Sequence, residues 1–152
     1  AINIKDGDDI IYVDITSGNS EIFIATKLGY SIRFHENDLR SLGRTAAGVI
    51  GIRLRDGDEV VSGVVISNPE QSILTVTENG FGKRTELLEY NLQSRGGLGV
   101  INIKVNERIG NVIDVKEVSG NEDIMLITSN CILLRTTVEK ISVIGRATQG
   151  VQ

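Results

Sequence analysis

The sequence has 152 residues, of which 40% are hydrophobic and 24% are charged, and its formal net charge is −4. This length and apolar fraction suit one folded domain with its own core, and they exclude a disordered tail or a collagen-like chain. No apolar run approaches the roughly 18 residues that cross a bilayer, and the first residues lack a signal-peptide pattern, so we expect a soluble protein.

Short strands separated by turns are expected from the beginning of the chain. Residues 1–19 contain INIKDGDDII, which resembles IRLRDGDEVV further along, so we expect this segment to complete a preceding structural unit. A hairpin is predicted over residues 21–34, and a strand over residues 49–54 is followed by an Asp-Gly turn and a strand over residues 59–66. Residues 36–42 and 86–92 are the two segments in which a short helical turn fits the sequence.

The next unit has the same order of elements. The β-branched run of residues 73–77 precedes Asn79-Gly80, a strong hairpin signal, and a return strand follows. Further strands are predicted over residues 98–105 and Val112–Val118, which makes about four strands per unit. Seventeen glycines, one proline and closely spaced turns therefore predict an all-β protein.

An internal repeat with a period of 51 residues organises the whole chain. Four columns of identical residues show it: Thr26, Thr77 and Thr128; Arg33, Arg84 and Arg135; Arg44, Arg95 and Arg146; and Gly48, Gly99 and Gly150. The repeats cover approximately residues 20–70, 71–121 and 122–152 of a single domain, 1–152. Repeated four-stranded units predict a propeller-like array of about three blades, and because three blades close poorly, we expect them to be part of a larger array.

One arginine column lies in glycine-bracketed loops. Glycines there allow close approach to backbone NH groups, and an arginine adds a bidentate donor, which together suit a phosphate contact. An alternative is structural: the glycines shape a bend and Arg44, Arg95 and Arg146 pack against a neighbouring blade. Both interpretations stay open from the residues alone.

Two further cationic columns are candidates for the same surface. Arg33, Arg84 and Arg135 lie on the predicted return strand with Lys83 beside Arg84, and Arg53 corresponds to Lys104. Such residues often only protect a sheet edge from aggregation. Their recurrence, with acidic residues clustered in the turns at residues 6–9 and 56–59, instead predicts a basic track that contacts DNA phosphates without reading base sequence.

Other chemistry is weakly supported. His35 has only neighbouring carboxylates and is interpreted as a surface residue, while Cys131 replaces the glycine of the other hairpins and, as a lone cysteine, suits a reducing cell interior. The scattered aromatic residues are expected in the core rather than on a base-stacking platform. No nucleophile elbow, phosphate-binding loop or zinc pattern occurs, so no catalytic residue, metal or cofactor is expected here.

The stretches GRTAAGVIGIRLRDGDEVV, TENGFGKRTELLEYNLQSRGGLGVINIKV and ISVIGRATQGV resemble the carboxy-terminal domain of bacterial DNA gyrase A. The resemblance covers essentially the whole chain. It implies a six-bladed β-pinwheel whose blades exchange strands and whose basic perimeter wraps double-stranded DNA. The cationic residues above would lie on that perimeter, and none of the three tyrosines here would be catalytic.

The resemblance also implies a cellular role and partners. The domain would support ATP-dependent negative supercoiling in the bacterial cytoplasm at the nucleoid, together with the rest of gyrase A and with gyrase B, while ATP and Mg²⁺ bind elsewhere in the enzyme. The family's Gln-Arg-Arg-Gly-Gly-Lys-Gly box has only an echo at residues 93–99, where Ser94 and Leu98 replace basic residues, so the segment resembles later blades. The alternatives are the corresponding tail of topoisomerase IV and a protein-interaction propeller.

Overall fold

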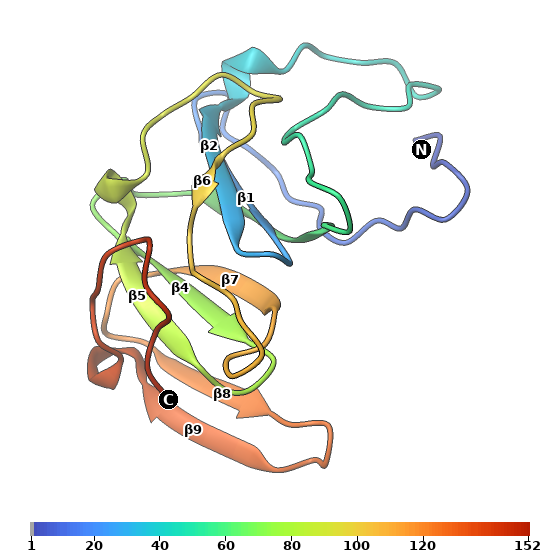
Figure 1. Cartoon of the computed structure of the whole chain (residues 1–152). Coiled ribbons are helices and arrows are strands. Elements are labelled where there is room, and N and C mark those ends of the chain that lie inside the picture. The colour runs from blue at the N-terminus through green and yellow to red at the C-terminus, as the bar shows by residue number, and fades with distance from the viewer. Residues whose placement is uncertain (1) are drawn as a thin grey trace.

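The computed structural model describes residues 2–152 as an all-β protein, as predicted (Figure 1). Its strands are β1 (Glu21–Thr26), β2 (Tyr30–His35), β3 (Val60–Ile66), β4 (Ser72–Thr77), β5 (Gly82–Glu86), β6 (Val100–Ile101), β7 (Val112–Val118), β8 (Asp123–Ile127) and β9 (Leu133–Thr137). Three short 3-10 helices, η1 (Glu36–Asp38), η2 (Leu87–Glu89) and η3 (Val138–Lys140), follow the hairpins. The first two lie within the segments where a helical turn fitted the sequence.

The strands form three sheets that follow one another along the chain (Figure 1). The first has the order β3-β1-β2-β6, the second β5-β4-β7, and the third consists of β8 and β9. The hairpins β1–β2, β4–β5 and β8–β9 are antiparallel, with the same register in each repeat. We call these three sheets the first, second and third blades.

A strand exchange links each blade to the next repeat. Strand β6 belongs to the second repeat, but it pairs with β2 of the first blade, where Val100 lies opposite Ser31. The bridge between Val151 and Gly82 repeats this pairing 51 residues later, in the second blade. The four-stranded first blade is therefore assembled from two repeats, whereas simple counting along the sequence had assigned four strands to each unit.

Two predicted strands are shorter or missing because of this exchange. Only Val100 and Ile101 of the predicted strand over residues 98–105 pair in a sheet. The next two residues continue no ladder: the amides of Asn102 and Ile103 both donate to the Gly29 carbonyl in the β1–β2 turn, and Ile103 is buried in the core between the blades. The predicted strand over residues 49–54 is wrong: these residues pair with no strand, and residues 2–20, where a preceding blade would supply its partner, contain none.

Gly99 permits the exchange arm to lie against β2. Its φ of +67° is in the left-handed region that favours glycine, and a Cβ atom there would collide with the Ser31 carbonyl oxygen. A side chain at this position would therefore separate the arm from the first blade.

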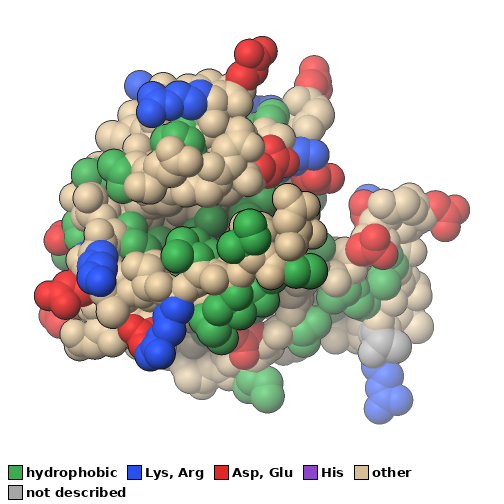
Figure 2. Space-filling model, turned by 90° about the horizontal axis from the view of Figure 1, so that it is seen from below, with side chains coloured by type: hydrophobic (Ala, Val, Ile, Leu, Met, Phe, Trp, Pro, Cys, Tyr) green, Lys and Arg blue, Asp and Glu red, His purple; other side chains and the backbone are tan. Residues whose placement is uncertain are grey.

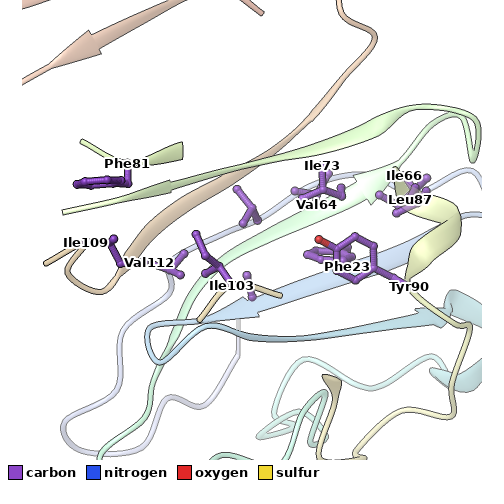
Figure 3. Packing of buried hydrophobic residues seen from close by; sticks show 12 residues of the cluster. Phe23, Val64, Ile66, Ile73, Phe81, Leu87, Tyr90, Ile103, Ile109 and Val112 are labelled. Atoms are coloured by element: carbon purple, nitrogen blue, oxygen red, sulfur yellow. The ribbon is translucent and has the colours of Figure 1, made fainter. Parts of the chain in front are cut away.

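The main core lies between the first and second blades (Figure 3). Alternate residues of β3, including Val64 and Ile66, face inward because successive side chains of a strand point to opposite faces. Phe23 packs edge-on against Tyr90 with 4.9 Å between ring centroids. Among the aromatic residues expected in the core, Phe23, Phe34, Phe81 and Tyr90 are buried, whereas Tyr12 and Tyr30 are not.

The third blade leaves apolar side chains uncovered. Large hydrophobic residues exposed on its two strands and their turn are Met125, Ile127, Ile132, Leu133 and Leu134. Figure 2 views the molecule from below, the end at which β8 and β9 lie in Figure 1, and shows hydrophobic side chains gathered across this face. The burial of apolar surface therefore decreases from the central blades toward the third.

Candidate nucleic-acid interface

Three arginine loops, residues 43–48, 94–99 and 145–150, follow the blade hairpins, and the second and third lead into the exchange pairings at Val100 and Val151. In each loop the final glycine, Gly48, Gly99 or Gly150, has a positive φ. The loops therefore have a common backbone feature, which in the second and third lies just before the chain pairs with the preceding blade.

Arg95 and Arg146 occupy equivalent positions in two successive loops. The Arg95 amide donates to the Asp38 carboxylate at 3.0 Å and its Nη1 to the Ile50 carbonyl at 2.7 Å. The Arg146 amide donates to Glu89 at 3.1 Å and its Nη1 to the Ile101 carbonyl at 3.2 Å. Both side chains are thus anchored by one end to the preceding repeat and remain half exposed.

Arg44 is the counterpart of these residues in the first loop. It is exposed, and no hydrogen bond or ion pair of its side chain occurs within residues 2–152. Packing against a neighbouring repeat, which was one of the two interpretations left open, therefore applies to Arg95 and Arg146. Part of each side chain nevertheless remains accessible.

Exposed cations lie beside the second and third arginine loops. The Arg53 amide donates to the Gly97 carbonyl at 2.8 Å, and the Lys104 amide donates to the Thr148 carbonyl, also at 2.8 Å. Both Arg53 and Lys104 are exposed. Each loop therefore has an anchored arginine and an exposed cation contributed by the preceding repeat, and we call the two combinations cationic pairs: Arg53 with Arg95, and Lys104 with Arg146.

Arg55 adds a cation that the sequence analysis did not single out. Its guanidinium lies 3.4 Å from the centroid of the Tyr30 ring, and its Nη1 donates to the Leu98 carbonyl at 3.0 Å. The signal was weak because Asn106 replaces arginine at the same position of the next repeat. Recurrence, which selected the other candidates, therefore could not select Arg55.

Arg33 is not on an exposed edge, and the expected placement is wrong for this residue. It is buried, and its Nε donates to Glu21 at 2.6 Å while its Nη1 donates to the carbonyls of Leu87 and Tyr90 at 3.0 and 3.1 Å. Arginine suits this position because its planar fork can satisfy a carboxylate and two carbonyls together. Arg33 thus attaches the first blade to η2 of the next repeat.

Lys83 is likewise fully buried, which corrects its expected exposed placement. Its Nζ donates to the carbonyls of Gly145 and Arg146 at 2.7 and 2.5 Å. Burial lowers the pKa of Lys83 to about 8; the charge of Glu89 opposes this shift and that of Arg146 adds to it. The lysine therefore acts within the protein, beneath an arginine loop.

The other two members of the return-strand column differ in exposure. Arg84 is half buried and its Nε donates to the Ile141 carbonyl at 2.8 Å, which repeats the role of Arg33. Arg135 is exposed and forms an ion pair with Asp123. Arg33 and Arg84 therefore contact the next repeat, whereas Arg135 pairs within its own hairpin, and the column is not a continuous exposed track.

Acidic residues gather near the turns at residues 6–9 and 56–59, as the sequence indicated. An open cleft of about 740 Å³ is lined by Asp8, Asp9, Glu59 and Glu78 together with apolar residues, and Lys27 forms an ion pair with Glu59 at 2.9 Å. No group of three or more acidic, histidine or cysteine side chains in residues 2–152 is arranged to hold a metal ion. In the same residues no helix is long and apolar enough to span a membrane.

The two residues interpreted as unremarkable have simple surroundings. His35 is half buried and its Nδ1 accepts a hydrogen bond from the Asn37 amide at 3.1 Å, which caps η1. Cys131 is exposed and has a φ of 59°, so it keeps the left-handed backbone of its glycine counterparts, Gly29 and Gly80.

Comparisons with known proteins agree with this architecture. The family described as "DNA gyrase C-terminal domain, beta-propeller" matches residues 1–17, 20–67, 71–119 and 122–152. DNA gyrase A of Staphylococcus epidermidis is 49% identical over 153 residues, and that of Salmonella typhimurium is 50% identical over 151 residues. These alignments cover 100% and 99% of this chain but 17% of each relative.

Solved structures show the same similarity in three dimensions. A DNA gyrase A C-terminal domain superposes with a TM-score of 0.91 at 30% identity, covering 99% of this chain and 52% of that structure. The C-terminal domain of a DNA topoisomerase IV superposes with a TM-score of 0.92 at 29% identity, covering 98% of this chain and 46% of that structure. With the family match along nearly its whole length, the chain belongs to the DNA gyrase C-terminal domain family.

Proposed function

We propose that this chain is a DNA-binding and DNA-wrapping segment of a DNA gyrase A protein, which bends duplex DNA along its blades. The observation that carries the proposal is the recurrence of a cationic pair on successive repeats. In each pair an exposed cation, Arg53 or Lys104, lies beside a loop whose arginine is held by a protein carbonyl. We include the exposed Arg44 as the corresponding residue of the first loop.

Phosphate contacts explain why such pairs would bind DNA without selecting a sequence. Arg95 and Arg146 are partly preorganised by their anchoring, so less conformational entropy is lost when they meet a phosphate. Bending 20–30 bp of DNA costs on the order of 1–6 kcal/mol, so contacts must be distributed along the curve. A pair supplied by each repeat would provide that distribution.

The proposal also assigns this segment a role within the whole gyrase enzyme. Within gyrase the segment would act without a catalytic residue of its own, and would support ATP-dependent negative supercoiling by presenting bent DNA to the rest of gyrase A and to gyrase B. ATP and Mg²⁺ would bind elsewhere in the enzyme. Its location would be the bacterial cytoplasm, at the nucleoid.

Salt-dependent DNA binding by full-length gyrase A tests the proposal. We expect the double variant Arg53→Gln/Lys104→Gln to bind duplex DNA more weakly, and to reduce the slope of log K against log salt by about 1 for each lost phosphate contact. The matched control is Lys116→Gln, which removes an exposed cation on β7 that already pairs with Asp114. If the double variant binds with the affinity and slope of the wild type, the proposed interface is wrong.

The acidic cleft favours a second candidate, a surface that docks a protein partner. Its lining by Asp8, Asp9, Glu59 and Glu78 suits a basic segment. This candidate would gain support if DNA binding were absent at low salt while variants neutralising these acids weakened assembly with the rest of gyrase.

A further inference from the structure

Three consecutive residues of β5 contact the segment that leads into the third arginine loop. The Arg84 amide donates to the Ser142 carbonyl at 3.0 Å, and Thr85 Oγ1 donates to the Ile144 carbonyl at 2.8 Å. Lys83 reaches furthest, to the carbonyls of Gly145 and Arg146. Together they hold the backbone on both sides of the point where the loop begins.

The first blade provides an internal comparison, because two of its equivalent residues have side chains that cannot donate a hydrogen bond. Ile32 and Phe34 stand where the second blade has Lys83 and Thr85. Ile32 is buried in an apolar cluster with Phe34 and Ile52, beneath the second arginine loop. One arginine loop therefore lies over a hydrophobic side chain, and the next lies over an ammonium group that binds two of its carbonyls.

We propose that Lys83 is a positioning residue that holds the third arginine loop, residues 145–150, in its DNA-binding shape. This inference rests on the proposed function. Two carbonyls tied to a buried ammonium group fix the direction of the loop backbone at Gly145 and Arg146. The Arg146 side chain, held at its other side by the Ile101 carbonyl, is then supported from both ends.

The charged groups around Lys83 also make its positioning role depend on whether its amine is protonated. Glu89 and Arg146 are the charged groups that face its ammonium, and burial already lowers its pKa to about 8. A DNA phosphate near Arg146 would favour the charged form of Lys83, so DNA binding would raise this pKa and take up protons. DNA affinity should consequently decrease as the pH rises above about 8, more steeply than in a variant without the amine.

The experiment compares one buried and one exposed lysine in full-length gyrase A. In Lys83→Met we expect amide hydrogen exchange within residues 145–150 to accelerate about tenfold, because two hydrogen bonds to a charged group are lost. DNA affinity should fall, and its dependence on pH between about 7.5 and 9.5 should become shallower, because the titrating amine is gone. In Lys104→Met we expect unchanged loop exchange, weaker binding and a salt slope reduced by about 1.

The results distinguish the positioning role of Lys83 from the proposed DNA interface. Unchanged exchange in the loop, or an unchanged pH profile of DNA binding, in Lys83→Met would overturn the positioning role. If Lys104→Met binds DNA as the wild type does, the proposed interface fails instead, and loop exchange still reports on Lys83 itself. Lys83→Ile serves as a second variant that should fold, since the first blade accommodates Ile32 at the same position.

Discussion

Arg33 and Arg135 occupy the same column of the repeat in opposite environments. Arg33 is buried and contacts Glu21 and two carbonyls of the next repeat, whereas Arg135 is exposed and pairs with Asp123. Identical residue type and strand position therefore do not determine energetic importance. The neighbouring repeat does, because it supplies the carbonyls and excludes water.

This difference predicts unequal costs of removing the two arginines. Arg33→Met should lower the free energy of unfolding by about 3–5 kcal/mol, because it leaves Glu21 and two carbonyls without their partner. Arg135→Met should change it by about 1 kcal/mol or less, as for other exposed ion pairs. Denaturant unfolding of both variants measures the costs, and equal values would contradict the structural role of Arg33.

Lys83 predicts a pH dependence of stability with a defined sign. Its folded pKa of about 8 is below the unfolded value of 10.5, so the unfolded chain binds more protons between these two values. The free energy of unfolding should therefore rise from about pH 8 to about pH 10.5, relative to Lys83→Met. Parallel stability curves for the two proteins over this range would refute the assignment.

At the scale of elements, the exchange arms pack differently in successive repeats. In the second repeat Asn102 Nδ2 donates to Thr75 Oγ1 at 3.0 Å, and the Tyr90 hydroxyl donates to Asn102 Oδ1 at 2.5 Å. In the first repeat, 51 residues earlier, the counterparts of Thr75 and Asn102 are Ile24 and Gly51. A Cβ at Gly51 would meet Ile24 Cδ1 at 2.5 Å, so the isoleucine fills the space that asparagine fills later.

Replacing Thr75 and Asn102 by their first-repeat counterparts, isoleucine and glycine, tests the packing of the exchange arm. Thr75→Ile alone should cost about 1–3 kcal/mol, because it crowds Asn102, and Asn102→Gly alone should destabilise by leaving a cavity and two hydroxyls without their partner. In the double variant isoleucine can occupy the vacated space, so its cost should be smaller than the sum by about 1 kcal/mol. Denaturant unfolding of the three variants measures these costs, and strict additivity would show that the two sites are independent.

At the scale of the whole molecule, stability should be uneven along the array. Repeat proteins are stabilised mainly by contacts between neighbouring units, and the third blade has such contacts on one side within residues 2–152. Met125 is 64% exposed, whereas Leu74, its counterpart in the second blade, is 3% exposed. Strands β8 and β9 are therefore expected to open more readily than β4 and β5.

Native-state hydrogen exchange of this chain measures that difference directly. Amides in the β8–β9 pairing should exchange at least about tenfold faster than the equivalent amides of β4 and β5, since less apolar surface holds the third hairpin in place. The repeat itself provides the control, because register and turn position are the same in both hairpins. Equal protection in the two hairpins would mean that the array unfolds as one unit.

Much of the fold could be predicted because its signals are local. The runs that became β4 and β7, and the turn at Asn79-Gly80, follow from side-chain propensity and turn chemistry over a few residues. The site was harder to predict. In the sequence, Arg33 and Lys83 looked as good candidates for an exposed basic surface as Arg53 and Lys104 did. In the structure the first two are buried and the last two are exposed.

The sequence by itself determined the all-β class, the 51-residue period, the hairpins and the resemblance to the gyrase family, because each is written in short patterns or in their repetition. Only the tertiary structure decided which strand completes which blade and which cations stay accessible. Both depend on contacts between residues of different repeats, such as Lys83 with Gly145. A short sequence pattern does not show which distant residues will pack over it.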